Sequence, residues 1–249
     1  MKSVLFLFAI GTAWWAIGQK EVVPVADKSF EPVVVLELFT SQGCSSCPAA
    51  DRLLTQTIQK SYEPKILALS FHVDYWNHLG WADPFSDKAY TKRQYAYAKK
   101  FNSRSVYTPQ MVVNGTAQFV GSNEAALKKA LSNATRQASS ANFDGLSVKP
   151  ASGNVLKVQY QLAGDYQNCK VNFALVSKRE NTAIKRGENG GRTLSSDNVV
   201  RQFITVPAIA SGEVLFNDRA GRPDDLSVIA YVQRAADLRI VGGAKVEVK

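Results

Sequence analysis

The sequence is poor in soft metal ligands. Its 249 residues contain three cysteines, two histidines and two methionines. Two of the cysteines, Cys44 and Cys47, form a Cys-x-x-Cys pair. A structural zinc site needs two more ligands beside such a pair. After the pair the chain offers only His72 and His78, and Cys169 is distant in sequence, so a zinc site is disfavoured.

Other features are also missing. The net charge is +9, but the lysines and arginines are spread along the chain without forming a basic block. A nucleic-acid-binding role is therefore not indicated. We find no internal repeat and no low-complexity tract. With 45% hydrophobic and 20% charged residues, the composition is that of an ordinary globular protein.

The N-terminal segment has the pattern of a secretory signal peptide. Lys2 precedes a short apolar run that ends in small residues around Ala16 and Gly18. The alternative, a retained anchor, is disfavoured because the run is shorter than the roughly 20 residues that a spanning helix needs. We predict a signal peptide at residues 1–18, a periplasmic or secreted location, and no membrane span after signal removal. Thiols in such compartments tend to be oxidised.

The first half of the chain predicts alternating strands and helices. The β-branched run at residues 33–39 is typical of a buried strand. A turn at residues 41–48 holds the two cysteines, and apolar residues at helical spacing follow it. Residues 66–73 form a second apolar run. The order predicts a β-α-β unit with parallel strands.

The pattern continues with a second helix and a hairpin. Ser86 and Asp87 can cap a helix that runs to about residue 102. Two short apolar runs at residues 110–113 and 117–120 flank an Asn-Gly turn, which is a strong hairpin signal. An Ala- and Leu-rich helix from Glu124 to about residue 138 follows. We expect Arg93 and Gln94 on the solvated face of the second helix.

From Gly145 onward the pattern changes to alternating strands separated by Gly, Asn and Asp turns. These strands include residues 156–162, 171–175 and 228–232. No comparably strong helix is apparent there. We therefore predict two domains, an α/β domain at residues 31–141 and a separate β-sandwich at residues 145–249.

The position of the two cysteines suggests a chemistry. A helix N-terminus presents unpaired N–H groups and partial positive charge, which favour thiolate over thiol. Cys44 is then the outer nucleophile, and Cys47, one turn further in, resolves a mixed disulfide. Two other roles stay open: a structural disulfide, which would constrain the unfolded chain little, and metal binding.

Four long segments carry a resemblance to a known family. They are LELFTSQGCSSCPAADRLL, FHVDYWNHLGWADPFSDKAYTKRQYAYA, VYTPQMVVNG and RGENGGRTLSSDNVVR. Together they resemble a family of secreted bacterial proteins of unknown function with a thioredoxin-like domain. The resemblance implies an α/β thioredoxin-like domain followed by an all-β sandwich-like domain, and the dithiol as a candidate site. It implies no substrate.

In thioredoxin-like proteins a cis proline sits beside the dithiol and presents backbone to an extended substrate. Pro109 occupies the matching place here, after two helices and before a hairpin, so we predict a cis bond to Thr108. Thr108 with Pro109 would align the substrate backbone. Trp76 and Trp81, in the aromatic loop after the second strand, are candidates for a peptide-binding wall.

Several other polar residues have candidate roles. His72 and Asp74 follow the second strand, at the sheet edge where the dithiol is expected, and could tune Cys44 or help to bind a metal. The glycine-rich residues 187–191 lack the pattern of a phosphate loop, and a loop with positive φ explains them better. Cys169 is expected to be a buried inert thiol, with pairing between chains as the alternative.

The leading hypothesis is a thiol-disulfide oxidoreductase acting on exported protein clients or a redox partner protein. Cys44, Cys47 and Pro109 would form its catalytic site, and it would need no cofactor beyond the redox-active disulfide. The alternative is a copper-binding or copper-delivery protein that uses Cys44, Cys47 and His72 as soft ligands. A third reading is a binding module with a vestigial dithiol.

Overall fold

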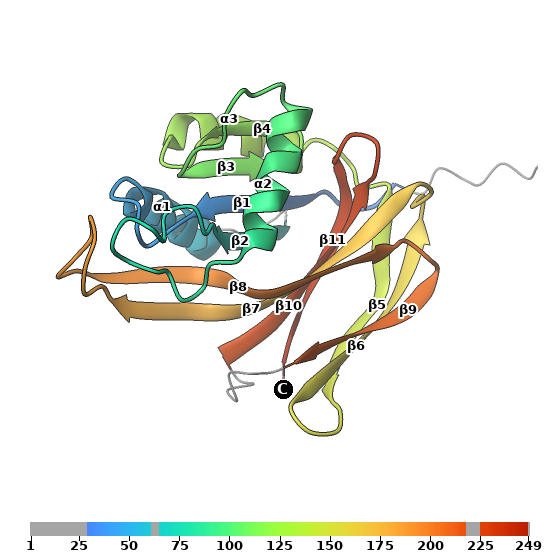
Figure 1. Cartoon of the computed structure of the whole chain (residues 1–249). Helices are drawn as coiled ribbons and strands as arrows, with labels where there is room; N and C mark the ends of the chain where they lie inside the picture. Colours follow the sequence, from blue (N-terminus) through green and yellow to red (C-terminus); the bar gives the residue numbers. More distant parts are fainter. Residues whose placement is uncertain (1–28, 61–64, 218–224, 249) are drawn as a thin grey trace, which may run out of the picture.

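We analysed a computed structural model, which describes residues 29–60, 65–217 and 225–248. The predicted signal peptide at residues 1–18 lies outside the described residues. The described residues form three helices and eleven strands (Figure 1). The elements are β1 (Val33–Thr40), α1 (Cys47–Lys60), β2 (Lys65–His72), α2 (Lys88–Lys100), β3 (Gln110–Val113), β4 (Ala117–Val120), α3 (Glu124–Ala134), β5 (Ala141–Pro150), β6 (Val155–Gly164), β7 (Cys169–Ala183), β8 (Thr193–Pro207), β9 (Ser211–Asn217), β10 (Leu226–Arg234) and β11 (Ile240–Glu247).

Strands from both halves of the chain form one sheet. Its eight strands have the order β11-β10-β7-β8-β2-β1-β3-β4. β1 and β2 are parallel, as are β2 and β8, which pair at Ser70 and Val199, and the remaining neighbours are antiparallel. A second sheet consists of three antiparallel strands in the order β5-β6-β9 and packs against the first.

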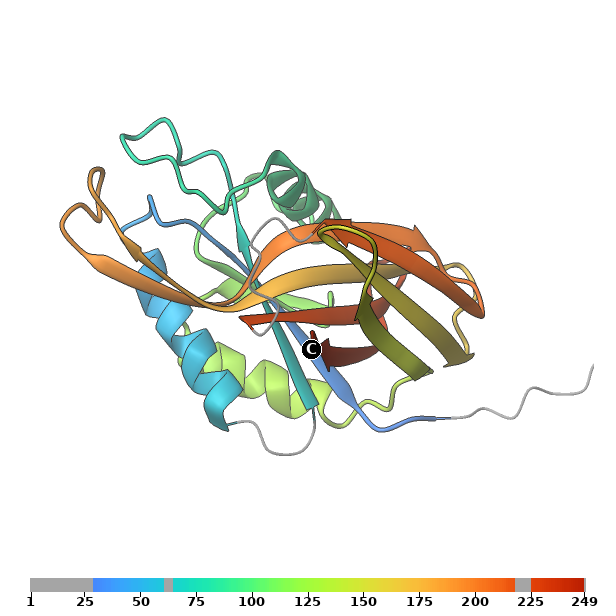
Figure 2. The same ribbon diagram turned by 90° about the horizontal axis from the view of Figure 1, so that it is seen from below.

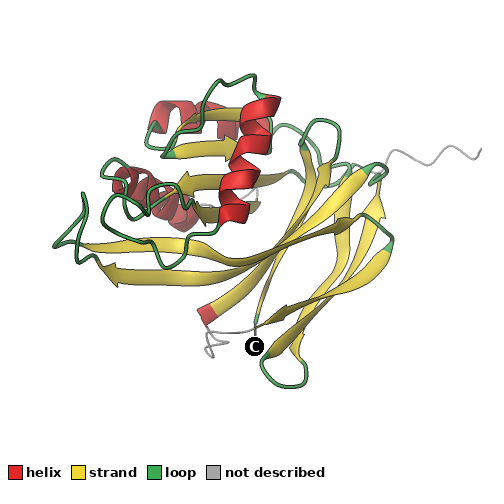
Figure 3. Ribbon diagram, in the orientation of Figure 1, coloured by secondary structure: helices red, strands yellow, loops and turns green. Residues whose placement is uncertain are grey.

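The predicted fold class is therefore wrong. The protein is mostly β, with a large mixed sheet that runs without interruption from the first half of the chain into the second (Figure 3). It is not a thioredoxin-like α/β domain followed by a β-sandwich. The error arose because residues 145–249 were expected to form a separate β-sandwich, whereas β8 pairs with β2 of the first half. The β8 segment Ser196–Val200 is buried where it meets β2.

The local elements were predicted more accurately. The first two strands are parallel around α1, as the β-α-β order predicts. Asp87 caps α2, with its side chain accepting a hydrogen bond from the Ala89 N–H at 2.7 Å. The hairpin of β3 and β4 forms around Asn114 and Gly115, both of which have positive φ. The Thr108–Pro109 peptide bond is cis.

Three apolar clusters hold these layers together. Figure 2 shows α1 and α3 on one face of the eight-stranded sheet and α2 on the other. Leu54 of α1 and Leu127 of α3 pack on the first face with Leu36 of β1. On the second face, Tyr90 and Tyr97 of α2 pack over β1 and β2. The third cluster, which we call the inter-sheet core, lies between the two sheets and includes Phe173 of β7 and Phe216 of β9.

The expectation that Arg93 and Gln94 lie on a solvated face of α2 is wrong. The Arg93 Nε donates to Glu37 Oε1 at 2.7 Å, and the Glu37 side chain on β1 is fully buried. Tyr231 Oη donates to the same carboxylate oxygen at 2.8 Å. Gln94 is also buried and donates to the Tyr107 carbonyl at 2.7 Å. These partners come from β1, β10 and the 101–109 segment, so local periodicity could not reveal them.

Candidate active site

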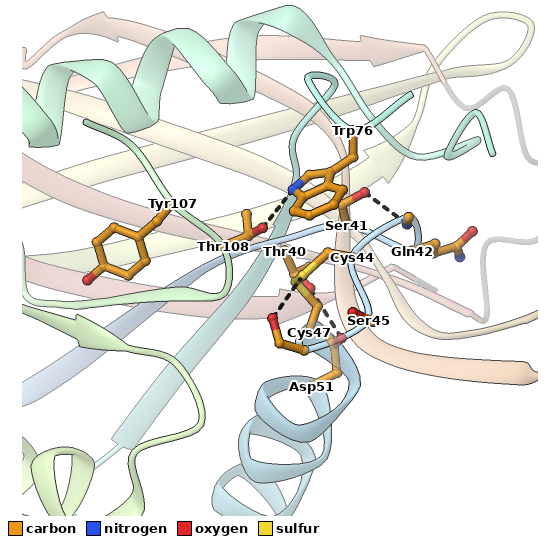
Figure 4. The surroundings of a disulfide bond; sticks show 12 residues. Thr40, Ser41, Gln42, Cys44, Ser45, Cys47, Asp51, Trp76, Tyr107 and Thr108 are labelled. Atoms are coloured by element: carbon orange, nitrogen blue, oxygen red, sulfur yellow. Dashed lines mark hydrogen bonds between the residues drawn. A yellow bond between two sulfur atoms is a disulfide. The ribbon is translucent and has the colours of Figure 1, made fainter. Parts of the chain in front are cut away.

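Cys44 and Cys47 form a disulfide at the start of α1 (Figure 4). Their Cα atoms are 5.4 Å apart, and the Cys47 N–H donates to the Cys44 carbonyl at 3.3 Å. β1 ends at Thr40, and the chain turns through residues 41–46 before α1 begins. Pro48 is tolerated in the first turn of the helix because its missing N–H has no intrahelical partner there.

The disulfide is shielded from solvent. Both cysteines have a relative exposure of 0%. Cys44 is therefore not exposed to solvent, although the sequence predicts it as the outer sulfur of the pair. Ser46, which is exposed, places its hydroxyl 3.4 Å from the Cys44 sulfur. Trp76 packs against the loop at Gly43, since a Cβ added to Gly43 would meet the Trp76 Cβ at 3.2 Å. Access to either sulfur therefore requires side chains to move.

Trp76 connects this loop to the segment that holds the cis proline. Its indole N–H donates to the Thr108 hydroxyl at 2.7 Å. Figure 4 shows the Trp76 ring and the Thr108 side chain pointing toward one another beside Cys44. Pro109 is buried, and both Pro109 and Ala50 of α1 come close to Gly121. The structure thus brings together Cys44, Cys47, Trp76, Thr108 and Pro109.

A buried carboxyl group lies one helical turn from Cys47. Asp51 shares the buried face of α1 with Cys47, Ala50 and Leu54. Its Oδ2 accepts a hydrogen bond from the Thr40 hydroxyl at 3.2 Å, and its Oδ1 has no partner in the structure. Burial raises the pKa of Asp51 to about 7. This carboxyl group can therefore exchange a proton near neutral pH.

His72 lies at the end of β2 and is also buried. Its Nδ1 lies 2.7 Å from Asp83 Oδ2, and its Nε2 has no partner in the structure. Burial acts to lower the pKa of His72, but the charge of Asp83 and its hydrogen bond raise it above the ordinary value. The pKa of Asp83 is lowered: burial would raise it, but the His72 charge and hydrogen bond and the N–H groups of Gln42 and Phe85 outweigh that effect.

The tip of the β7–β8 hairpin reaches this site from the second half of the chain. Asn189, fully buried, donates from Nδ2 to the carbonyls of Gln42 at 2.9 Å and Cys44 at 3.0 Å. The Ser45 N–H donates to Glu188 Oε2 at 2.9 Å. Gly187 and Gly191 have φ of 78° and 81°, which confirms the predicted positive-φ loop. The second half therefore supplies contacts to the loop that bears the disulfide.

Trp81 takes part in the same contact. Its indole N–H donates to Gln42 Oε1 at 3.1 Å, and Gln42 Nε2 donates to the Thr182 hydroxyl of β7 at 2.9 Å. A Cβ added to Gly187 would meet the Trp81 Cβ at 3.2 Å. Trp81 thus packs between the disulfide loop and the hairpin tip, half-buried. Its suggested role as a wall for a peptide stays a prediction.

Two of the predicted residues lie outside this contact network. Asp74 accepts a hydrogen bond from the Thr91 hydroxyl of α2 at 2.6 Å. Cys169 is a buried free thiol at the start of β7, and burial raises its pKa. Within residues 29–60, 65–217 and 225–248, no three or more His, Cys, Asp or Glu side chains are grouped as a metal site. The copper hypothesis with Cys44, Cys47 and His72 stays a prediction from sequence.

With this geometry in hand, comparison with known proteins gives one decisive match. Residues 35–233 match the model of a family described as protein of unknown function, DUF1223. The chain belongs to the DUF1223 family. The family assignment by resemblance is thus confirmed, and the DUF1223 match includes every residue of the site from Thr40 to Asn189. A search among curated proteins finds no match.

Two solved structures resemble this DUF1223 protein over most of its length. A structural-genomics target protein from Agrobacterium tumefaciens is 29% identical, with a TM-score of 0.66, covering 90% of this chain and 97% of that one. HBP35 of Porphyromonas gingivalis is 16% identical, with a TM-score of 0.60, covering 88% of this chain and 76% of that one. The second likeness shows the fold alone.

Sequence reasoning missed four polar residues of this DUF1223 site: Asp51, Asp83, Glu188 and Asn189. A signal existed for Asp51, because Cys47, Ala50, Asp51 and Leu54 follow the spacing of a buried helix face. An acidic residue on such a face is unusual. No local signal marks Asn189 or Glu188, since their partners lie about 145 residues earlier.

Among the described residues, no helix has the length and apolarity to cross a membrane.

Proposed function

We propose that this protein is a thiol-disulfide oxidoreductase that acts through Cys44 and Cys47 on protein disulfides outside the cytoplasm. The observation that carries the proposal is the Cys44–Cys47 disulfide at the start of α1, beside the Thr108–Pro109 segment. A helix start favours the thiolate form that such exchange needs. A disulfide that closes so short a loop adds little stability by constraining the unfolded chain, so a redox role explains the pair better.

The exchange is balanced in atoms and electrons. In the reducing direction, the Cys44 thiolate attacks one sulfur of a client disulfide, and a Cys44–client disulfide replaces the client S–S bond. The Cys47 thiolate then attacks the Cys44 sulfur and releases the second client thiolate. Two electrons pass from the dithiol to the client, and the client thiolates take up the two protons. A dithiol of a redox partner protein would reduce the Cys44–Cys47 bond again.

Asp51 supports this chemistry. Cys47 must lose a proton before it can attack the mixed disulfide, and Asp51 is buried one turn along the same helix face. A general base works best when its pKa lies near the operating pH. The Asp51 pKa of about 7 meets that condition. Asp51 is therefore assigned the role of proton acceptor for Cys47.

Access to the site is part of the proposal. Both cysteines are fully buried, so a client disulfide reaches Cys44 only after Trp76 and Ser46 move aside. Trp76 is held by one hydrogen bond to Thr108 and is only half-buried. Displacement of this side chain would also uncover the backbone of Thr108 for an extended client segment.

Trapping tests the proposal. The Cys47→Ser variant of the full chain, expressed in its native compartment, is expected to accumulate mixed disulfides through Cys44. These complexes would disappear on reduction and would be identified by mass spectrometry. The matched control, Cys169→Ser with the pair intact, should trap nothing. If Cys47→Ser folds, as judged by circular dichroism, yet yields no covalent partner, and the wild type reduces no protein disulfide, the proposal is wrong.

A further inference from the structure

The tip of the β7–β8 hairpin places a charged side chain, Glu188, at the disulfide loop. We propose that Glu188 is a positioning residue that shifts the Cys44–Cys47 pair toward its disulfide form and so poises it as an electron donor to its client. This inference rests on the proposed function and adds the direction of electron transfer, from the dithiol to the client. Three observations carry it: the docking of the tip, the contact of the carboxylate and the charges around the loop.

The tip is docked firmly enough to hold a charge in place. Asn189 binds two carbonyls of the disulfide loop, and Arg192 Nη1 donates to Asn189 Oδ1 at 3.1 Å. Backbone hydrogen bonds close the tip on itself, from the Gly190 N–H to the Gly187 carbonyl at 3.0 Å and from the Gly191 N–H to the Ile184 carbonyl at 2.8 Å. The hairpin therefore holds the Asn189 side chain against the disulfide loop.

Glu188, the residue before Asn189, places its carboxylate at the disulfide loop. Glu188 Oε2 accepts the N–H of Ser45, the residue that follows Cys44, at 2.9 Å. Hydrogen bonding to the Ser45 side chain, together with this bond to its N–H, lowers the pKa of Glu188 below its ordinary value. The side chain is therefore ionised at neutral pH, and its negative charge lies against the peptide that links Cys44 to Ser45.

The charge acts on only one redox state. Reduction of the disulfide produces a Cys44 thiolate, and a nearby carboxylate disfavours a second negative charge. The disulfide itself carries no charge. Glu188 therefore destabilises the reduced, ionised form relative to the oxidised form. A pair that prefers the disulfide has a low reduction potential and gives its electrons away readily.

Three other charged side chains bond to the loop or to residues next to it. Asp83 accepts the Gln42 N–H at 2.8 Å from the inner side, but it is paired with His72. Asp51, also on the inner side, has a pKa of about 7 and is partly protonated at neutral pH. The Arg192 guanidinium contacts Asn189. Glu188 supplies a full negative charge with a direct bond to the backbone beside Cys44.

The test removes the charge and keeps the hydrogen-bond acceptor. In the Glu188→Gln variant of the full chain, the amide oxygen can still accept the Ser45 N–H. The variant and the wild type are equilibrated with glutathione redox buffers at pH 8, and the reduced fraction is measured by thiol alkylation. We expect the equilibrium to shift about two- to fivefold toward the dithiol, the range of a charge near a helix terminus. That shift corresponds to a potential higher by about 10 to 20 mV.

A second readout and a control isolate the effect. The pH dependence of Cys44 alkylation in the reduced protein should show a Cys44 acid-dissociation constant about two- to fivefold larger in Glu188→Gln. The control is Glu213→Gln on β9, which removes an exposed carboxylate of the other sheet. It should change neither quantity.

The outcomes separate this inference from the proposed function. An unchanged or lower potential in Glu188→Gln overturns the inference, even if Cys47→Ser traps clients. A shifted potential supports the inference, even if no client is trapped. A Glu188→Gln variant with the wild-type potential but lower stability would show that Glu188 serves only to dock the hairpin, which also overturns it.

Discussion

Two regions of the molecule are held together in different ways. The disulfide end of the large sheet joins Thr40–Cys47, the 73–87 loop and the hairpin tip through side-chain hydrogen bonds to buried backbone groups. The inter-sheet core is almost wholly apolar, with Phe173 fully buried among aliphatic and aromatic side chains. Each polar contact contributes about 1 kcal/mol net, whereas a buried phenyl ring contributes several. The inter-sheet core thus contributes mainly stability, whereas the proposed chemistry lies at the disulfide end.

The strongest test of this comparison removes a ring from the inter-sheet core. Phe173→Ala should lower the free energy of unfolding by about 3–5 kcal/mol, because it leaves a cavity next to Tyr160, whose ring centroid lies 5.1 Å from that of Phe173. Urea denaturation measures the loss. The glutathione equilibrium of the Cys44–Cys47 pair in the folded variant should stay at the wild-type value. A large change in that equilibrium would mean that the two regions are coupled.

Asp51 gives the disulfide end a pH dependence of stability between pH 4 and pH 8. Its folded pKa of about 7 exceeds the ordinary value of 3.8, so its contribution to stability is full below pH 3.8 and is lost as the pH rises through 7. Asp51→Asn removes this loss and should stabilise the protein at pH 8, relative to pH 4, by on the order of 2–4 kcal/mol. Denaturation midpoints across this range measure the effect.

Two neighbours of Asp51 set the controls for that experiment. The raised pKa of His72 also costs stability as the pH rises, whereas the lowered pKa of Asp83 costs stability as the pH falls. Because the charge of Asp51 itself helps to raise the pKa of His72, the difference between the two pH profiles reports Asp51 together with this coupling. Equal pH profiles for the two proteins would contradict the assigned pKa. Loss of disulfide exchange in Asp51→Asn, with the fold intact, would support its role as proton acceptor.

Asn189 tests whether the disulfide end depends on the hairpin. Asn189→Ala leaves the carbonyls of Gln42 and Cys44 without this donor, and should cost about 2 kcal/mol in unfolding free energy. The matched control is Asn181→Ala on the same hairpin. Asn181 is exposed and accepts a bond from Ser195, and its loss should cost less than about 0.5 kcal/mol. Equal effects of the two variants would contradict the role of Asn189 in docking the hairpin to the disulfide loop.

The smallest effect is expected at the third cysteine. Cys169 is a buried free thiol at the edge of the inter-sheet core, where it acts as a small apolar side chain. Cys169→Ala should lower stability by less than about 1 kcal/mol and leave the Cys44–Cys47 pair oxidised. A variant in which the disulfide state changed would show exchange with Cys169 and would break the separation of the two regions.

Much of the local structure followed from short-range patterns. The β-branched run before Thr40, the capping Asp87 and the Asn114-Gly115 turn each predict an element that the structure contains. The cis bond before Pro109 was predicted from the order of elements and the resemblance. Such features depend on neighbouring residues, whose steric and hydrogen-bonding preferences act within a few positions. The β8 pairing and the partners of Arg93, Asn189 and Glu188 depend on contacts across more than 50 residues, which no local pattern encodes.

The sequence by itself determined roughly where the strands, helices and turns of the first half lie, and it put the two cysteines together at the start of a helix. Only the tertiary structure decided that β8 pairs with β2 and joins both halves into one sheet, and that Trp76, Asn189 and Glu188 contact the loop that bears the disulfide. The physical reason is that strand pairing and docking are chosen by mutual burial of distant surfaces. A strand such as β8 presents the same side chains whichever neighbour it finally meets.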